Sequence, residues 1–237
     1  MSMTEQELLE GIRQCRVADL SDGMDALGLV SKGTMSTEMT PIRPGISFAG
    51  WAWTVKLEHS NETFEPCSTV EEYMEQNDKF CGNIYSFMKE MKKQDVTDHV
   101  LVIDMEGYPG GILGSENMMK YTLDGMVGAV VDGGCRDIYE CNLEQVNVFS
   151  TKKTFQHVSG RMKMGEIGVP VKCAGVHIEP RDIICADDDG VLVIPQERAE
   201  EVLTFARAIL QKDQKVRTSH YEALGFKPDE TLARVDS

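Results

Sequence analysis

The sequence lacks the features that would indicate a nucleic-acid-binding, membrane-spanning or disulfide-bonded protein. No basic run interrupts a composition of 24 basic and 39 acidic residues, and the net charge of -15 repels nucleic acid and anionic membrane surfaces. No stretch approaches the roughly 18 consecutive apolar residues of a membrane span. The seven cysteines form no CxxC pair, and the chain does not open with a basic and then apolar leader. We therefore expect a cytoplasmic protein.

Patterns for nucleotide, zinc or covalent-nucleophile chemistry are also missing. The glycines between positions 107 and 114 match neither of the common nucleotide-binding fingerprints. The five histidines have no metal-ligand spacing, and Cys135 and Cys141 fit no zinc pattern, so we interpret these residues as structural. Cys135 stands beside a cation that can lower a thiol pKa, but a buried, unreactive cysteine is the preferred interpretation.

Helix and strand patterns alternate along the chain and predict one α/β domain. Capping residues and apolar faces predict helices over 4–14, over 22–27 with Ser21 as N-cap, over 115–123 and from 196 towards 221, and two more within 58–98. Strands are expected over 46–57, 100–104, 126–131, 143–150 and 171–178, with a hairpin over 183–194 around the acidic turn 187–190. Trp51 and Trp53 should face one layer.

The segment 126–140 combines a buried strand with two charged residues. Its apolar run is expected to end at the turn 132–134, Asp-Gly-Gly. Arg136 and Asp137 follow where the chain leaves a sheet and enters a helix, a usual place for ligand-binding side chains in open α/β sheets. Glu140 lies on the same helical face as Asp137, and two carboxylates near one arginine could hold Mg²⁺. A solvated helix start capped by Asp137 is an equally good interpretation.

A glycine-rich stretch over 106–111 is expected to form a loop that leads into the helix starting at Ser115. Free amides at the start of that helix would suit a small carboxylate, because the helix dipole is positive there. A tight connection without any ligand explains the same glycines equally well.

Four motifs in this order resemble the RraA-like family: Ser21–Gly28, Phe48–Val55, Gly125–Asp137 and Ala186–Val191. This family includes class II pyruvate aldolases acting on 4-hydroxy-4-methyl-2-oxoglutarate and 4-carboxy-4-hydroxy-2-oxoadipate. The resemblance covers residues 15–57 and 99–210. Residues 58–98 are longer than the usual connection of the family and are expected to reshape one wall of the cleft or the subunit contact. Arg181 stands where the family usually has glycine.

The resemblance implies an α/β/β sandwich of the swivelling, phosphohistidine-like type, with residues 1–195 in the domain and 196–237 in a C-terminal helical arm. It also implies a homotrimer or homohexamer with active sites between subunits. In the family's motif, the counterpart of Arg136 binds the pyruvyl group, and that of Asp137 holds a divalent metal largely through waters, with Glu140 in support. A substrate carboxylate would bind the amides around Gly114, Ser115, Glu116 and Asn117. Aldolases take a further acid from a neighbour's C-terminal helix, and Asp213 stands near the expected place.

The leading hypothesis is a Mg²⁺- or Mn²⁺-dependent carbon–carbon lyase that cleaves or decarboxylates a short 2-oxo acid to give pyruvate. Oxaloacetate decarboxylation needs the same enolate as aldol cleavage, so one site can do both. The alternative is a non-enzymatic regulator that binds RNase E, because the family contains such proteins. A methyltransferase, an older label within the family, is disfavoured because no glycine-rich loop with a matching acid suits S-adenosylmethionine.

Overall fold

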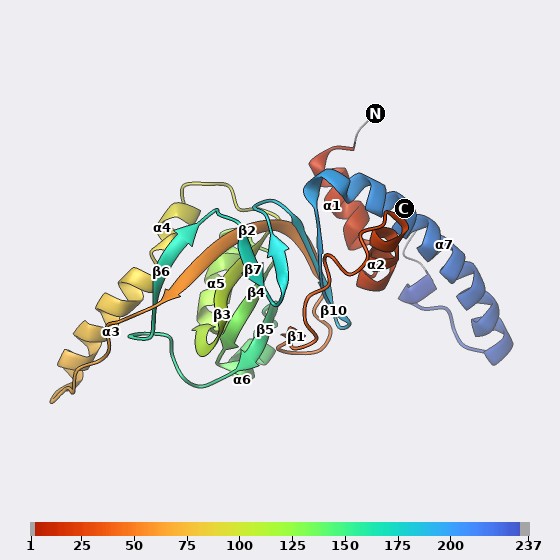
Figure 1. The fold of residues 1–237 in the computed structure, drawn as a ribbon. Coiled ribbons are helices and arrows are strands. Elements are labelled where there is room, and N and C mark those ends of the chain that lie inside the picture. Colours follow the sequence, from red (N-terminus) through yellow and green to blue (C-terminus); the bar gives the residue numbers. More distant parts are fainter. Residues whose placement is uncertain (1–2, 233–237) are drawn as a thin grey trace.

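The computed structural model describes residues 3–232 and shows a mixed α/β protein with a large mixed sheet and a long C-terminal helix (Figure 1). The helices are α1 Glu5–Arg13, α2 Val17–Ala26, α3 Val70–Ile84, α4 Phe87–Met91, α5 Ser115–Leu123, α6 Ile138–Leu143 and α7 Ala199–Leu224. The strands are β1 Thr40–Pro41, β2 Phe48–His59, β3 His99–Leu113, β4 Gly128–Cys135, β5 Val148–Lys153, β6 Met162–Ile167, β7 Val171–Cys173, β8 Val176–Ile178, β9 Ile183–Asp187 and β10 Gly190–Ile194. Short 3₁₀ turns occupy Gln196–Arg198 and Glu230–Leu232. Within residues 3–232, no helix combines the length and apolar character needed to cross a membrane.

The large sheet has the strand order β1-β5-β4-β3-β2-β9-β10, and β6 pairs with the outer half of β2. The central strands β2, β3, β4 and β5 are parallel, whereas β1, β6, β9 and β10 pair antiparallel. β7 and β8 form a separate two-stranded sheet. The predicted α/β/β architecture is confirmed. Because β3 and β4 are parallel, with Leu113 opposite Cys135, their ends deliver Gly114 and Arg136 to the same edge of the sheet.

Two apolar clusters hold the fold together. The larger one includes Trp53, Phe87, Tyr121 and Phe149, and the smaller one joins α1, α2 and α7 to β9 and β10. Trp51 belongs to the smaller cluster and Trp53 to the larger one. Both residues pair with β3 in one continuous register, opposite His99 and Leu101, so their side chains lie on the same face of β2 but pack at different places along it.

Helices α2 and α7 pack so closely that one glycine is required between them. A Cβ added at Gly23 would lie 2.7 Å from the backbone oxygen of Val202. We predict that Gly23→Ala lowers the free energy of unfolding by about 1 kcal/mol or more, because overpacking outweighs the helix propensity that alanine gains. Urea denaturation measures the change. Gly82→Ala, in α3 with nothing within 4 Å of the added Cβ, is the control and should be neutral or stabilising.

The segment between β2 and β3 forms an arm at one end of the molecule, and α7 extends at the opposite end (Figure 1). The two helices predicted within 58–98 are confirmed as α3 and α4, and Thr69 and Glu72 form the expected capping box. The first half of α3 is exposed, including Tyr73, whereas Ile84 and Phe87 are fully buried. Only the C-terminal end of the arm is therefore built into the core.

Several sequence-based expectations about turns and boundaries are wrong. Ser21 lies inside α2, which begins one turn earlier because the Asp19 carboxylate accepts hydrogen bonds from the backbone and side chain of Arg16. The stretches 106–111 and 132–134 are not turns but parts of β3 and β4, which pair with each other there in an irregular register. The strand expected over 143–150 begins only at Val148, and the one expected over 171–178 divides into β7 and β8.

Other boundaries agree with the sequence-based expectations. α1 carries the predicted capping box of Thr4 and Glu7, and α5 and the β9–β10 hairpin lie where they were expected. α7 continues beyond Tyr221. Arg181 has a φ of 74°, a left-handed conformation that favours glycine, which accounts for the glycine usual at this place. Its guanidinium lies 4.9 Å from the centre of the Trp51 ring.

Candidate functional site

The candidate site lies where β3 and β4 end, and glycines allow these two strands to approach each other. A Cβ on Gly134 would lie 2.5 Å from the backbone oxygen of Gly110, and a Cβ on Gly133 would lie 2.7 Å from the Met105 sulfur. Larger residues would push the strands apart. The glycines that look like a turn in the sequence are therefore needed for close strand pairing at the edge that carries the site.

The backbone and the aliphatic stem of Arg136 are held in place, whereas its side chain is partly exposed. Its backbone amide donates to the Leu113 carbonyl oxygen at 2.9 Å, and its aliphatic stem lies over Gly111, where an added Cβ would be 3.1 Å from the arginine Cβ. The side chain is 38% exposed, and its Nε lies 3.7 Å from Asp137 Oδ2. The guanidinium can therefore meet a ligand with most of its donors free.

Asp137 does not cap the helix that follows it, so the interpretation as a capped helix start is wrong. Its φ of 56° and ψ of 41° are left-handed, and its side chain makes no capping hydrogen bond to α6. The carboxylate instead lies against Gly114, where an added Cβ would come within 2.2 Å of Oδ2. The side chain is 44% exposed. Two predicted site positions from different strands thus meet directly.

The first turn of α5 forms the other side of this contact. Gly114 precedes the helix without a side-chain cap, Ser115 is buried, and Glu116 is exposed. Asn117 is half-buried. The amides of a first turn have no partner within their own helix, so they can bind an anion. The structure therefore brings Gly114, the start of α5, Arg136 and Asp137 together.

The donor set suits a hydrated divalent ion better than a caged one. Within residues 3–232, no group of three or more histidine, cysteine or acidic side chains could hold a metal ion. Mg²⁺ usually keeps several waters and needs only one or two carboxylates. Asp137 supplies an exposed carboxylate, which lies against Gly114. Glu140, also exposed, follows in the first turn of α6.

Tyr85 and His157 lie against the end of β3 beside this site, and no sequence motif points to either residue. The Tyr85 hydroxyl lies 3.2 Å from His157 Nε2, and Gly111 pairs with His157 through an isolated bridge. Burial and the cations Arg136 and Arg161 lower the pKa of His157 to about 4, so its ring is neutral at physiological pH. The closeness of Tyr85 and His157 to Arg136 depends on tertiary contacts that no local pattern encodes.

Two other predicted residues have defined surroundings. Cys135 is fully buried, and both its hydrogen bond with Cys141 and its burial raise its pKa, which confirms the interpretation as an unreactive cysteine. Asp213, on α7, forms an ion pair with Arg16 of the same chain at 2.8 Å, and this pair lowers the pKa of Asp213. Asp213 lines a separate pocket with the turn Asp187–Asp189.

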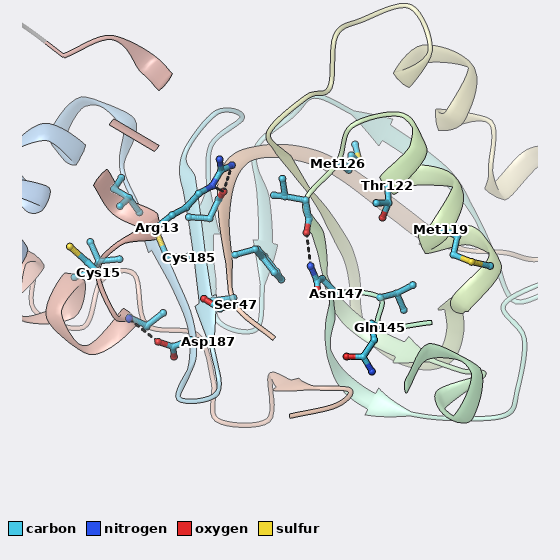
Figure 2. A pocket seen from close by; sticks show the side chains of 18 of the residues that line it. Arg13, Cys15, Ser47, Met119, Thr122, Met126, Gln145, Asn147, Cys185 and Asp187 are labelled. Carbon is cyan, nitrogen blue, oxygen red and sulfur yellow. Dashed lines mark hydrogen bonds between the residues drawn. The ribbon is translucent and has the colours of Figure 1, made fainter. Parts of the chain in front are cut away.

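A larger cavity, about 720 Å³, lies away from the Arg136 site (Figure 2). Arg13, Cys15 and Cys185 line one side, and Met119 and Asn147 the other. Two of its polar side chains already have partners within the protein. Arg13 donates to the Ala49 carbonyl oxygen and pairs with Asp98, and Asn147 donates to the Val127 carbonyl oxygen.

Comparison with known proteins identifies the relatives of this chain. The model of the RraA-like family, described as Aldolase/RraA, matches residues 17–193. A Halalkalibacterium halodurans protein provisionally named 4-hydroxy-4-methyl-2-oxoglutarate aldolase is 30% identical over 219 residues, covering 92% of this chain and 90% of the relative. Protein DlpA of Legionella pneumophila is 28% identical over 92% of this chain, which spans only 32% of DlpA. The crystal structure of Streptomyces coelicolor RraAS2 has a TM-score of 0.73 and 22% identity, over 92% of this chain and 98% of that one.

Proposed function

Because the chain belongs to the RraA-like family, we propose that it is a carbon–carbon lyase that releases pyruvate from a short 2-oxo acid. One observation carries this proposal: the Asp137 carboxylate lies against Gly114 and beside the Arg136 guanidinium, where β3 and β4 end. A cationic side chain can bind the carboxylate of a 2-oxo acid, and a carboxylate side chain can bind a hydrated divalent ion. The aldolase name of the Halalkalibacterium halodurans relative supports the same class of reaction.

Arg136 would bind the carboxylate and carbonyl oxygens of the pyruvyl group. A guanidinium presents its donors in a planar fork that matches two oxygens at once. The stem packed over Gly111 limits how far the tip can move, which favours one orientation of the substrate. The amides from Gly114 to Asn117 would bind a second substrate carboxylate at the positive end of α5.

The reaction moves negative charge towards Arg136. In aldol cleavage the C4 hydroxyl loses its proton, the C3–C4 bond breaks, and its electron pair moves towards the C2 carbonyl oxygen to give the enolate of pyruvate. Loss of carbon dioxide from oxaloacetate gives the same enolate, and protonation at C3 completes either reaction. Arg136 then interacts more strongly with the transition state than with the substrate. Mg²⁺ or Mn²⁺ held by Asp137, with Glu140 in support, would supply Lewis-acid stabilisation of the same charge.

We place this site between the subunits of a homotrimer or homohexamer, as the family resemblance implies. The exposed tips of Arg136 and Asp137 leave the cleft open on the side where a neighbour would complete it. Asp213 of a neighbour's α7 is the candidate for the additional acid. Its ion pair with Arg16 would then also fix the orientation of the carboxylate.

The proposal is tested by measuring pyruvate release from a panel of 2-oxo acids that includes oxaloacetate and 4-hydroxy-4-methyl-2-oxoglutarate. We predict release from at least one of them, loss of that activity with a chelator, and recovery with added Mg²⁺ or Mn²⁺. Asp137→Asn is the matched control, because it keeps the shape of the side chain but removes its charge. The absence of metal-dependent pyruvate from every acid would contradict the proposal.

The alternative, a regulator that binds RNase E, has weaker support. RraAS2 is described as an unusual member of the RNase ES inhibitor RraA protein family. Its identity to this chain is 22%, and this similarity supports a shared fold but not a shared role. A regulator would bind RNase E strongly in a pull-down, and neither a chelator nor Arg136→Ala would change that binding. The activity of a lyase would be lost with the chelator and also in the Arg136→Ala variant.

A further inference from the structure

Two helices extend beyond the core, at opposite ends of the molecule (Figure 1). The buried residues of α3 are Phe80 and Ile84, which lie in its C-terminal half. Those of α7 lie in its N-terminal half, and Leu210 is the last of them. The outer half of α3, residues 70–79, and the outer half of α7, residues 211–224, therefore bury no side chain. Because packing of an amphipathic face supplies most of the stability of a helix in a protein, both outer halves lack their usual support.

The outer half of α3 continues the apolar stripe with which this helix faces the core. Val70, Tyr73 and Met74 are spaced as one side of a helix, in line with the buried Phe80 and Ile84. Their side chains are 67%, 47% and 51% exposed. A stripe that is buried at one end and open at the other is typical of a surface that another molecule covers.

Acidic residues accompany this open stripe. Glu71, Glu75 and Asp78 follow each other at intervals of four and three residues, so they share one side of the helix with Met74. All three are exposed. Within the described chain, the only ion pair of this outer half is made by Lys79. The outer half of α3 therefore presents an apolar centre among uncompensated negative charges.

The outer half of α7 has the complementary pattern. Lys212, Lys215 and Val216 share one side of the helix, because they are three and four residues apart. Val216 is 49% exposed, both lysines are exposed, and neither lysine forms an ion pair with any residue that the structure describes. The acids of this half are Asp213, which is already in an ion pair, and Glu222 near the end of the helix. The exposed apolar residue here lies among positive charges.

We propose that the outer half of α3 in one copy of this chain binds the outer half of α7 in a second copy, so that the copies join head to tail. The two surfaces lie at opposite ends of the molecule, so one chain cannot pair them with each other (Figure 1). Like charges disfavour pairing of α3 with α3 or of α7 with α7. Since each copy carries one surface of each kind, a closed ring leaves neither surface uncovered.

This contact would direct a neighbouring copy towards the candidate site. Tyr85 follows α3 directly, and its hydroxyl donates to the Ile112 carbonyl oxygen at 2.9 Å, two residues before Gly114. The inner end of α3 is therefore tied to the strand that carries the site. The inference nevertheless goes beyond the proposed function, because the contact assigns a surface for self-assembly whether or not the protein is a lyase.

Charge reversal tests the contact, with the dissociation constant of self-association measured by analytical ultracentrifugation. Glu71→Lys/Glu75→Lys and Lys212→Glu/Lys215→Glu should each raise this constant at least about tenfold, because attraction between two pairs of charges becomes repulsion. The variant that carries all four changes should return to within about threefold of the wild-type constant. A wild-type protein that is monomeric at every concentration would overturn the proposal, as would a variant with all four changes that assembles no better than the two-residue variants.

The matched control is Asp22→Lys/Asp25→Lys, which reverses two exposed acids of α2 outside both surfaces. It should leave the dissociation constant unchanged, and circular dichroism should show that every variant is folded. A loss of assembly as large as that of the α3 variant would show that net charge governs association, which would contradict the proposed contact. Normal assembly of the α7 variant would contradict it too, because the copies would then pair without α7.

Zero-length cross-linking of carboxylates to lysines examines the contact in the wild-type protein. In a mixture of unlabelled and isotopically labelled chains, we expect links between residues 71–78 of one copy and Lys212 or Lys215 of another. An oligomer whose links all lie on other surfaces would overturn the proposal. An assembled protein with these links that releases no pyruvate would keep the contact and contradict the proposed function, whereas an active monomer would do the reverse.

Discussion

Arg136→Ala is expected to lower turnover by at least about a hundredfold, the usual effect of removing a group that stabilises transition-state charge. The folded state should be little affected, because the guanidinium is partly exposed and its only ion pair within residues 3–232 is with Asp137 at 3.7 Å. Steady-state rates of pyruvate release, with the melting temperature as a check on folding, measure both effects. Asp137→Ala should cause a loss of the same size.

Arg136→Lys is the informative control for the role of the arginine. Lysine keeps the charge and most of the stem over Gly111, but it loses the planar pair of donors. We expect intermediate activity if the guanidinium binds two oxygens. Near-normal turnover in Arg136→Ala, or in Asp137→Ala, would rule out this location for the active site.

Gly114→Ala should reduce kcat/KM by about a hundredfold, because displacement of a catalytic group by about 1 Å has that effect. The backbone of Gly114, with φ of -144° and ψ of -173°, is extended and accepts any residue. The added Cβ would instead lie 2.2 Å from Asp137 Oδ2 and force the carboxylate to rotate away. Since the obstacle is the tip of a side chain, stability should change little.

Gly82→Ala serves as the control here too, because its added Cβ meets nothing within 4 Å. It should retain full activity and gain slightly in stability, as alanine is favoured over glycine in a helix. A Gly114→Ala enzyme with unchanged kcat/KM would show that the contact between Gly114 and Asp137 does not matter for catalysis.

Much of the fold could be predicted from local patterns. The capping boxes at Thr4 and Thr69 set the starts of α1 and α3, and the acidic turn after β9 set the hairpin. Arg136 and Asp137 could be predicted as site residues because they follow a buried strand directly. Such features depend on neighbours in the sequence, so the sequence is sufficient to find them.

The failures share a physical cause. Residues 106–111 and 132–134 have the composition of turns, yet they pair with each other as strands. Their glycines allow the two backbones to approach closely. Ser21 is a good N-cap, but the contact of Asp19 with Arg16 starts the helix earlier. In these places a tertiary or side-chain contact outweighs local propensity.

The same reason explains which site residues escaped prediction. Tyr85 and His157 are 72 positions apart in the chain, and their contact depends on the arm after β2 meeting the loop after β5. His157 in particular has no spacing to any other histidine that would suggest a function. Only the folded structure brings these two residues together near Arg136.

The left-handed conformation of Asp137 has a consequence for which acid this position can carry. Aspartate and asparagine are the non-glycine residues that adopt this conformation most readily, and other residues pay about 1–2 kcal/mol for it. Glutamate would pay that strain, and its extra methylene would move the carboxylate away from the position that it takes against Gly114. The backbone thus selects the shorter of the two acids before any ligand does.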